Sequence, residues 1–128
     1  MGIMDPQGVK FSDDHVWVME MGDALRVGLS DYAQEQLGEI LSVSRVEEGR
    51  FVEAGETLFE LESQKTVVEL PSPVTGTVRA VNGTVMDDPS LINVDPYGKG
   101  WVVEIEADEP EELDRLMDPD AYEAFTEE

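Results

Sequence analysis

Lys65 is the residue whose type and position point most directly to a chemical role. It lies in the segment Glu62-Ser63-Gln64-Lys65-Thr66, and only two other lysines, Lys10 and Lys99, occur among the 128 residues. A lysine at such a position, in a chain with few cations, is either an ordinary turn residue or the attachment point of a covalently bound group. The spacing around Lys65 leaves both interpretations open.

The chain offers little other chemistry. It contains no cysteine, which excludes a disulfide framework, a thiolate nucleophile and a sulfur-ligated metal. His15 follows Asp13 and Asp14, but a single histidine beside consecutive aspartates lacks the ligand spacing of a metal site. We therefore expect no bound metal and interpret His15 as a structural or cleft-lining residue. Any redox chemistry must come from a group that the protein borrows.

Two alternating segments position Lys65. Residues 57–62 and 67–70 alternate apolar and polar side chains, which is the pattern of strands with one buried face. A short turn separates them. The pattern therefore predicts a hairpin with Lys65 at its tip, where a modifying enzyme and several partners can reach the same amine.

The rest of the chain predicts a mostly β protein. Residues 15–20 and 24–29 indicate two strands joined at Gly22-Asp23. Further strand candidates are residues 39–46, 50–52, 76–81, 84–86 and 101–106. Short strands with frequent glycine and proline between them indicate a sandwich or barrel. Trp17 and Trp101 fall within alternating strands and are expected to anchor the core.

Two helices are also predicted. Ser30 is a suitable N-cap for a short helix over residues 31–37. A second, C-terminal helix is expected to open at Pro110, capped by Asp108 or Glu109. Past a break at Asp118-Pro119 it continues an apolar stripe that we expect to pack on the sheet, made of Leu113, Leu116, Met117, Tyr122 and Phe125.

An internal similarity flanks the lysine. Residues 38–43 resemble residues 76–81, and residues 52–58 resemble residues 85–91. Two half-units of this kind, related by a pseudo-twofold axis with the Lys65 hairpin between them, would form a flattened sandwich of two small sheets.

Length and charge limit the classes of function. A chain of 128 residues with 41% hydrophobic residues fits one domain over residues 1–128. A net charge of −22 makes nucleic acid and anionic membranes poor partners, and it suits a solvated surface or a salty cytoplasm. The N-terminal residues lack a basic region followed by an apolar one, and no apolar run is long enough to span a membrane. A soluble, cytoplasmic protein is expected.

The order of these motifs resembles the lipoyl and biotinyl carrier domains, and in detail the H proteins of the glycine cleavage system. The blocks that carry the resemblance are Phe11-Ser12-Asp13-Asp14-His15-Val16-Trp17, Val27-Gly28-Leu29-Ser30-Asp31-Tyr32-Ala33, Glu62-Ser63-Gln64-Lys65, Ser72-Pro73-Val74-Thr75-Gly76, Asp95-Pro96-Tyr97-Gly98-Lys99-Gly100-Trp101 and the tail Glu111, Leu113, Leu116, Asp120, Tyr122. The resemblance implies a barrel-sandwich hybrid that is a carrier and not an enzyme. It also implies that a lipoate-protein ligase or lipoyltransferase links lipoate to Lys65. Biotin carriers resemble Met-Lys-Met at the tip, whereas Gln64 and Thr66 flank this lysine.

The resemblance further implies an arm cleft and reveals one departure. Glu62 and Ser63 flank the lysine, while Asp14, His15 and Glu69 are the residues expected near the cleft into which a loaded arm folds. Where H proteins have a glutamate in this cleft, the chain has Val16. Valine cannot pair with a protonated aminomethyl group, although Asp14 and Glu69 could take over that role.

Three functions stay open on this evidence. The preferred one is an H-like lipoate-binding protein that serves sulfur oxidation with a heterodisulfide-reductase-like complex, because of Val16, the altered flanks of Lys65 and the strong acidity of the chain. The alternative is a glycine cleavage H protein that carries aminomethyl groups among glycine decarboxylase, aminomethyltransferase and lipoamide dehydrogenase. The third is an unmodified structural or interaction module, which the intact Lys65 argues against.

Overall fold

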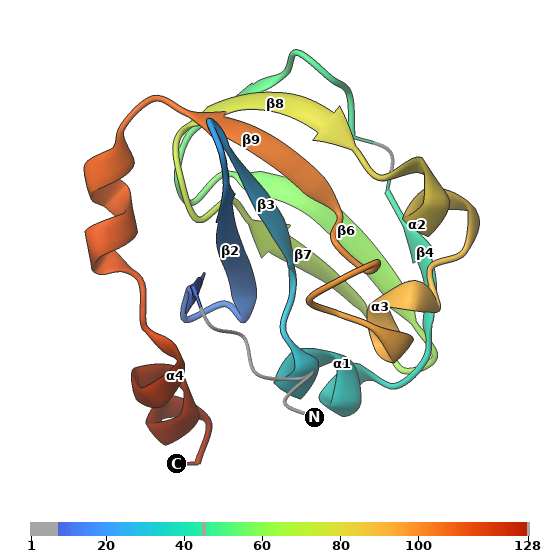
Figure 1. Cartoon of the computed structure of the whole chain (residues 1–128). Helices are drawn as coiled ribbons and strands as arrows, with labels where there is room; N and C mark the ends of the chain where they lie inside the picture. Colours follow the sequence, from blue (N-terminus) through green and yellow to red (C-terminus); the bar gives the residue numbers. More distant parts are fainter. Residues whose placement is uncertain (1–7, 45, 128) are drawn as a thin grey trace.

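Two antiparallel sheets form the body of the computed structural model, which describes residues 8–44 and 46–127 (Figure 1). The larger sheet has six strands in the order β1-β2-β3-β9-β8-β5, and the smaller has three in the order β4-β6-β7. Their bounds are β1 Val9–Phe11, β2 Val16–Met21, β3 Ala24–Leu29, β4 Ile40–Val43, β5 Phe51–Val52, β6 Thr57–Ser63, β7 Val67–Pro71, β8 Gly76–Val81 and β9 Val103–Ala107. This arrangement confirms the expected mostly β, barrel-sandwich hybrid fold.

The two hairpins follow from their turns. Strands β2 and β3 pair from Val16 opposite Leu29 to Met21 opposite Ala24. Gly22 in the connecting turn has a φ of 69°, which glycine adopts without the steric cost of a side chain. Strands β6 and β7 form the second predicted hairpin, with Glu62 opposite Val67.

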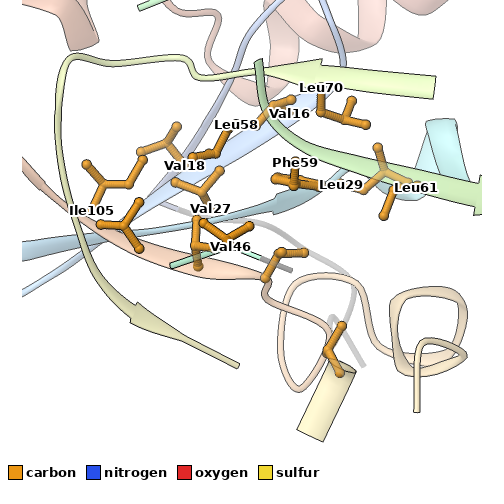
Figure 2. Packing of buried hydrophobic residues seen from close by; sticks show 14 of the residues in the cluster. Val16, Val18, Val27, Leu29, Val46, Leu58, Phe59, Leu61, Leu70 and Ile105 are labelled. Atoms are coloured by element: carbon orange, nitrogen blue, oxygen red, sulfur yellow. The ribbon is translucent and has the colours of Figure 1, made fainter. Parts of the chain in front are cut away.

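The main core lies between the two sheets (Figure 2). Val27 of β3 and Ile105 of β9 pack with Phe59 and Leu61 of β6, and each of these side chains is at most 1% exposed. Burying one such side chain stabilises the fold by roughly 1.5–3 kcal/mol. The alternation that predicted these strands is therefore the pattern that fills the core.

Helix α1 (Asp31–Leu37) has the predicted bounds. The Ser30 hydroxyl oxygen accepts a hydrogen bond from the backbone N–H of Ala33 at 3.1 Å, which caps the first turn. Gly38 ends the helix with a φ of 80°.

The C-terminal segment differs in detail from the predicted single helix. It contains a 3₁₀ helix, η1 (Pro110–Arg115), followed by α4 (Pro119–Thr126). The Asp118 carboxylate accepts a hydrogen bond from the Ala121 N–H at 2.8 Å and so starts α4 afresh, whereas Glu109 occupies the N-cap position of η1 without a side-chain cap. The stripe does pack on the sheet, because Tyr122 contacts Phe11 of β1 and Leu113 contacts the main core.

Residues 84–86, predicted as a strand, are helical instead. They belong to α2 (Gly83–Asp87), because the Asn82 side-chain oxygen accepts a hydrogen bond from the Thr84 N–H at 3.1 Å and caps a helix there. This corrects the proposed repeat, whose second pair of segments, 52–58 and 85–91, matches strands with helices. Strand β1 and helix α3 (Leu91–Val94) were not predicted, and residues 1–7 of the polar lead-in and Arg45 lie outside the described residues.

A second apolar cluster joins the C-terminal helix to the outer edge of the large sheet. Its buried members are Val9, Phe11, Trp17 and Tyr122. Trp17 is fully buried as predicted, and its indole N–H donates to the Pro96 carbonyl at 3.0 Å. Trp101 precedes β9 and is only partly buried, with the Arg26 guanidinium 4.7 Å from its ring centroid. Among the described residues, no helix is long and apolar enough to cross a membrane.

Candidate functional site

Lys65 lies at the tip of the β6–β7 hairpin, where the sequence places it. One serine closes this turn: the Ser63 hydroxyl oxygen accepts hydrogen bonds from the N–H groups of Lys65 and Thr66 at 3.1 and 3.2 Å. The same hydroxyl donates to the Thr66 carbonyl at 3.2 Å, while the Ser63 N–H donates to that carbonyl at 2.8 Å. The backbone of the tip is therefore held in one conformation and the lysine side chain projects from it.

The Lys65 side chain is exposed and lightly held. Its ammonium group donates one hydrogen bond, at 3.1 Å, to the Gln36 carbonyl in the last turn of α1. An exposed contact of this kind contributes about 1 kcal/mol or less, so acylation of the amine would cost the fold little. Gln64 fixes the hairpin to the same region, because its N–H donates to the Glu39 carbonyl at 3.0 Å.

A cleft of about 510 Å³ opens beside this lysine. It lies between α1, β7 and the turn that precedes β2, and Gln36, which accepts the bond from Lys65, is part of its wall. The residues that line it are Asp13, Asp14, His15, Leu29, Tyr32, Ala33, Gln36, Leu37, Val68, Glu69 and Leu70. Three of the residues predicted for the arm cleft, Asp14, His15 and Glu69, are thus brought together.

Two neighbouring residues of this cleft, Asp14 and His15, have shifted pKa values. Burial, aided by repulsion from Asp13, raises the pKa of the Asp14 carboxyl, and His15 opposes this rise. Burial lowers the pKa of His15 below its usual value, although Asp14 and Asp13 pull it upward. Burial therefore shifts both His15 and Asp14 toward their neutral forms.

The backbone at His15 is in the left-handed region, with a φ of 70°. For a residue with a side chain this conformation costs roughly 1–3 kcal/mol and persists only where the surroundings fix it. Here the His15 N–H donates to the Ser12 carbonyl at 3.1 Å, and the His15 carbonyl accepts from the Ser30 N–H at 3.0 Å. Its ring nitrogen Nδ1 lies 2.7 Å from the Tyr122 hydroxyl. In the part of the chain that the structure describes, no three His, Asp or Glu side chains are grouped as metal ligands.

Two residues that the sequence drew attention to are not in the cleft wall. Glu62 lies on the exposed face of the small sheet, where its carboxylate accepts a hydrogen bond from the Ser42 hydroxyl at 3.2 Å. Val16 is 0% exposed and packs in the main core, on the strand that follows His15 (Figure 2). The acidic residues that line the cleft are Asp13, Asp14 and Glu69 instead.

Sequence reasoning missed three side chains that matter here. Tyr32 and Gln36 line the cleft, and their spacing of four residues on a capped helix would have placed them on one face. Tyr122 was expected only as part of an apolar stripe. Its contact with His15 spans 107 residues of sequence, and local patterns carry no signal for it.

The cleft fits a long apolar chain with a polar end. Leu29, Val68 and Leu70 supply an apolar lining, and the acidic residues Asp14 and Glu69 border it. The Glu69 carboxylate accepts a hydrogen bond from the Thr57 hydroxyl at 3.3 Å, outside the cleft. Lys65, which bonds to Gln36 of the cleft wall, is an amine that an acyl group can modify. A two-sheet β fold that presents a lysine on a closed hairpin beside such a cleft defines a carrier protein, whose reactive group is attached to it.

Comparison with known proteins gives the family. The family model described as glycine cleavage H-protein matches residues 9–128. The glycine cleavage system H protein of Bifidobacterium longum is 47% identical over 119 residues, covering 91% of this chain and 84% of that protein. The probable glycine cleavage system H protein of Haloarcula marismortui is 41% identical, covering 91% and 92%. This chain belongs to the glycine cleavage H-protein family, whose members are non-catalytic carriers of lipoate on a lysine.

A solved structure agrees with this assignment. The crystal structure of a glycine cleavage system H protein from Mycobacterium marinum superposes with a TM-score of 0.86 and is 32% identical, and the match covers 94% of this chain and 98% of that one. The expected family, fold and lipoyl cofactor are confirmed, as is the expectation of a carrier that is not an enzyme.

Proposed function

We propose that this chain is the lipoyl carrier of a glycine cleavage system, with lipoate attached to Lys65. It moves an aminomethyl group from glycine decarboxylase to an aminomethyltransferase and then meets lipoamide dehydrogenase. The observation that carries the proposal is the position of Lys65, whose ammonium group touches α1 at the wall of the cleft that contains Asp14 and Glu69. The carrier is one domain over residues 1–128, acts in the cytoplasm and is loaded by a ligase or lipoyltransferase.

The residues of the chain divide the work. The attached lipoyl group supplies the dithiolane chemistry that a chain without cysteine lacks. Ser63 holds the attachment point still, Leu29, Val68 and Leu70 offer an apolar surface to the arm, and Asp14 and Glu69 are the acids available to a cationic end, Glu69 by releasing its contact with Thr57. A charge-assisted hydrogen bond in such a partly enclosed cleft contributes about 1.5–3 kcal/mol.

Glycine cleavage is favoured over sulfur oxidation for two reasons. The sequence preference for sulfur oxidation rested in part on Val16, and that residue lies in the core while other acidic residues line the cleft. The relatives described above also carry the glycine cleavage name, and none of them supports a sulfur-oxidation role. A cleft with its own carboxylates has no need of an acid at position 16.

The first test is the site of attachment. After expression with lipoate and a matching ligase, intact-mass analysis is expected to show one lipoyl group, which Lys65→Arg abolishes because a guanidinium does not form the amide. Lys10→Arg and Lys99→Arg are the matched controls and keep the modification. Lipoate on either of those residues, or a changed circular dichroism spectrum in Lys65→Arg, contradicts the assignment.

The second test is the pathway. Lipoylated wild-type protein is expected to support glycine–bicarbonate exchange with glycine decarboxylase. The double variant Asp14→Asn with Glu69→Gln loses about 10-fold or more in rate, since it removes the anionic partners of the cleft. Glu106→Gln, an exposed position on β9, is the control for the loss of negative charge. A lipoylated wild-type protein that fails to support exchange would contradict a role in glycine cleavage and favour a role in another pathway.

A further inference from the structure

A partly buried series of hydrogen bonds links the cleft to the C-terminal helix α4. Tyr122 of α4 is 6% exposed. Its hydroxyl lies 2.7 Å from Nδ1 of His15 and 2.7 Å from the Ser30 hydroxyl oxygen. One phenol group, remote in sequence from Lys65, therefore contacts both a residue of the cleft wall, His15, and the N-cap residue of α1, Ser30.

The two residues that the Tyr122 hydroxyl contacts, His15 and Ser30, are both connected to the surroundings of Lys65. His15 lines the cleft directly. Ser30 caps α1 by accepting from the Ala33 N–H, and the last turn of α1 supplies the Gln36 carbonyl that holds the Lys65 ammonium group. A shift of the Tyr122 hydroxyl would alter the cleft wall and the start of this helix together.

The ring and the hydroxyl of Tyr122 have separate roles. The ring stacks on Phe11 with centroids 4.1 Å apart and planes within 5°, which anchors α4 to β1. The hydroxyl hydrogen-bonds to His15 and Ser30. Burial raises its pKa to about 12, so the group stays protonated at neutral pH. The contact of this hydroxyl with Nδ1 is the hydrogen bond that holds the His15 ring in its orientation.

We propose that Tyr122 is a positioning residue for the carrier's cleft, whose hydroxyl fixes the imidazole of His15 and the start of α1 in the arrangement that receives the attached lipoyl group. The C-terminal helix is thereby part of the functional site and not only a cover for the sheet. This inference rests on the proposed function for its purpose, while the contacts that it invokes exist in the unmodified chain.

The test uses Tyr122→Phe, which removes the hydroxyl and keeps the ring on Phe11. His15 is the only histidine of the chain, so its ring nitrogens give unambiguous ¹⁵N signals in the full-length, unmodified protein. In the wild type these signals are expected to show one dominant tautomer, since Nδ1 is tied to the phenol. In the variant they move toward a mixture of tautomers, and the Ala33 amide exchanges faster.

The matched control is Tyr97→Phe. The Tyr97 hydroxyl accepts a hydrogen bond from the Asp31 N–H at 3.0 Å, so this variant also loses a phenol at the start of α1 but leaves His15 untouched. Its His15 signals are expected to stay at their wild-type positions. After lipoylation, Tyr122→Phe accepts lipoate as the wild type does but supports glycine–bicarbonate exchange about threefold to tenfold more slowly.

Two results overturn the inference. One is a set of wild-type His15 ¹⁵N signals that already shows a mixture of tautomers. This result is obtained on the wild type alone, so it does not depend on the folding of a variant. The other is an equal change of the His15 signals in both variants. Failure of the proposed function itself looks different: Lys65 is not lipoylated, or the loaded wild type supports no exchange, while the His15 signals respond as described.

Discussion

His15 is the residue in which backbone, burial and charge act on one another most directly. Its backbone is left-handed and it lines the cleft, where burial lowers its pKa and the nearby aspartates limit that fall. The same burial raises the pKa of Asp14. The two neighbours thus move toward the neutral form, which lowers the cost of keeping them in a partly enclosed site.

We predict that His15 titrates below 6.5 and that its protonation destabilises the fold. Because the unfolded chain binds this proton more readily, the stabilising effect is fully present above the unfolded pKa and is lost as the pH falls through the folded value. Denaturant unfolding of the wild type and His15→Gln between pH 7.5 and 5.5 measures it. The wild type is expected to lose stability relative to the variant as the pH falls, and parallel curves would contradict the lowered pKa.

The sequence predicted the chemistry of the site better than its geometry. Lys65 could be identified because lysine is rare here and its strands alternate, and Asp14, His15 and Glu69 followed from the family pattern. The burial of Val16 was not apparent, since neighbouring residues 16, 17 and 18 are all buried and the strand faces apolar neighbours on both sides. Simple alternation carries no information about such a strand.

At the scale of elements, α3 connects parts of the chain that meet under the lysine hairpin. The Asn93 amide group of α3 donates to the Gly38 carbonyl at 2.9 Å and to the Gln34 side chain at 2.8 Å. Its side-chain oxygen accepts from the Ile40 N–H at 3.0 Å. A single amide therefore joins the end of α1 to the start of β4.

Asn93→Ala is expected to lower the free energy of unfolding by about 1–3 kcal/mol, because it leaves the Ile40 N–H and the Gly38 carbonyl without these partners. Urea unfolding measures the loss, and faster exchange of the Ile40 amide locates it. Asn93→Asp keeps the acceptor for the Ile40 N–H, so its free energy of unfolding should lie between those of the wild type and Asn93→Ala. A variant as stable as the wild type would show that water replaces the amide at no cost.

The sequence predicted a helix correctly where a capping residue precedes residues that favour a helix. It predicted a strand wrongly where a capping residue precedes residues with high β propensity. Ser30 and Gly38 define α1 within a few residues of sequence. Thr84 and Val85 favour a strand, but the Asn82 cap decides for a helix. Helix α3 was missed because its polar contacts, through Asn93, are made to residues more than fifty positions away.

At the scale of the whole molecule, charge is the dominant unusual property. The chain contains thirty acidic residues and only eight basic ones. The ion pairs found among the described residues, Arg26–Glu104, Arg50–Glu56 and Arg79–Asp23, neutralise few of these acids. Repulsion among the remaining carboxylates therefore opposes the compact state.

We predict that the melting temperature rises with salt. Screening shortens the range of repulsion to about 10 Å near 0.1 M and to about 3 Å at 1 M, so the gain continues into molar salt. Calorimetry in sodium chloride from dilute buffer to 1 M measures the effect, with a neutral osmolyte at equal osmolality as the control. A flat or falling curve would mean that bound ions or local pairing already compensate the acids.

The closed hairpin tip has a consequence for how partner enzymes would find a group attached to Lys65, as proposed above. Since Ser63 holds the backbone at Lys65, a tether on that residue would swing about a stationary pivot, and its free end would sample a small volume centred on that point. An enzyme docked within this volume meets the end at an effective concentration that tether length and docking geometry set, on the order of millimolar for short flexible links. A looser tip, as in Ser63→Gly, would enlarge that volume and dilute the end for every partner at once, without changing how tightly any of them binds.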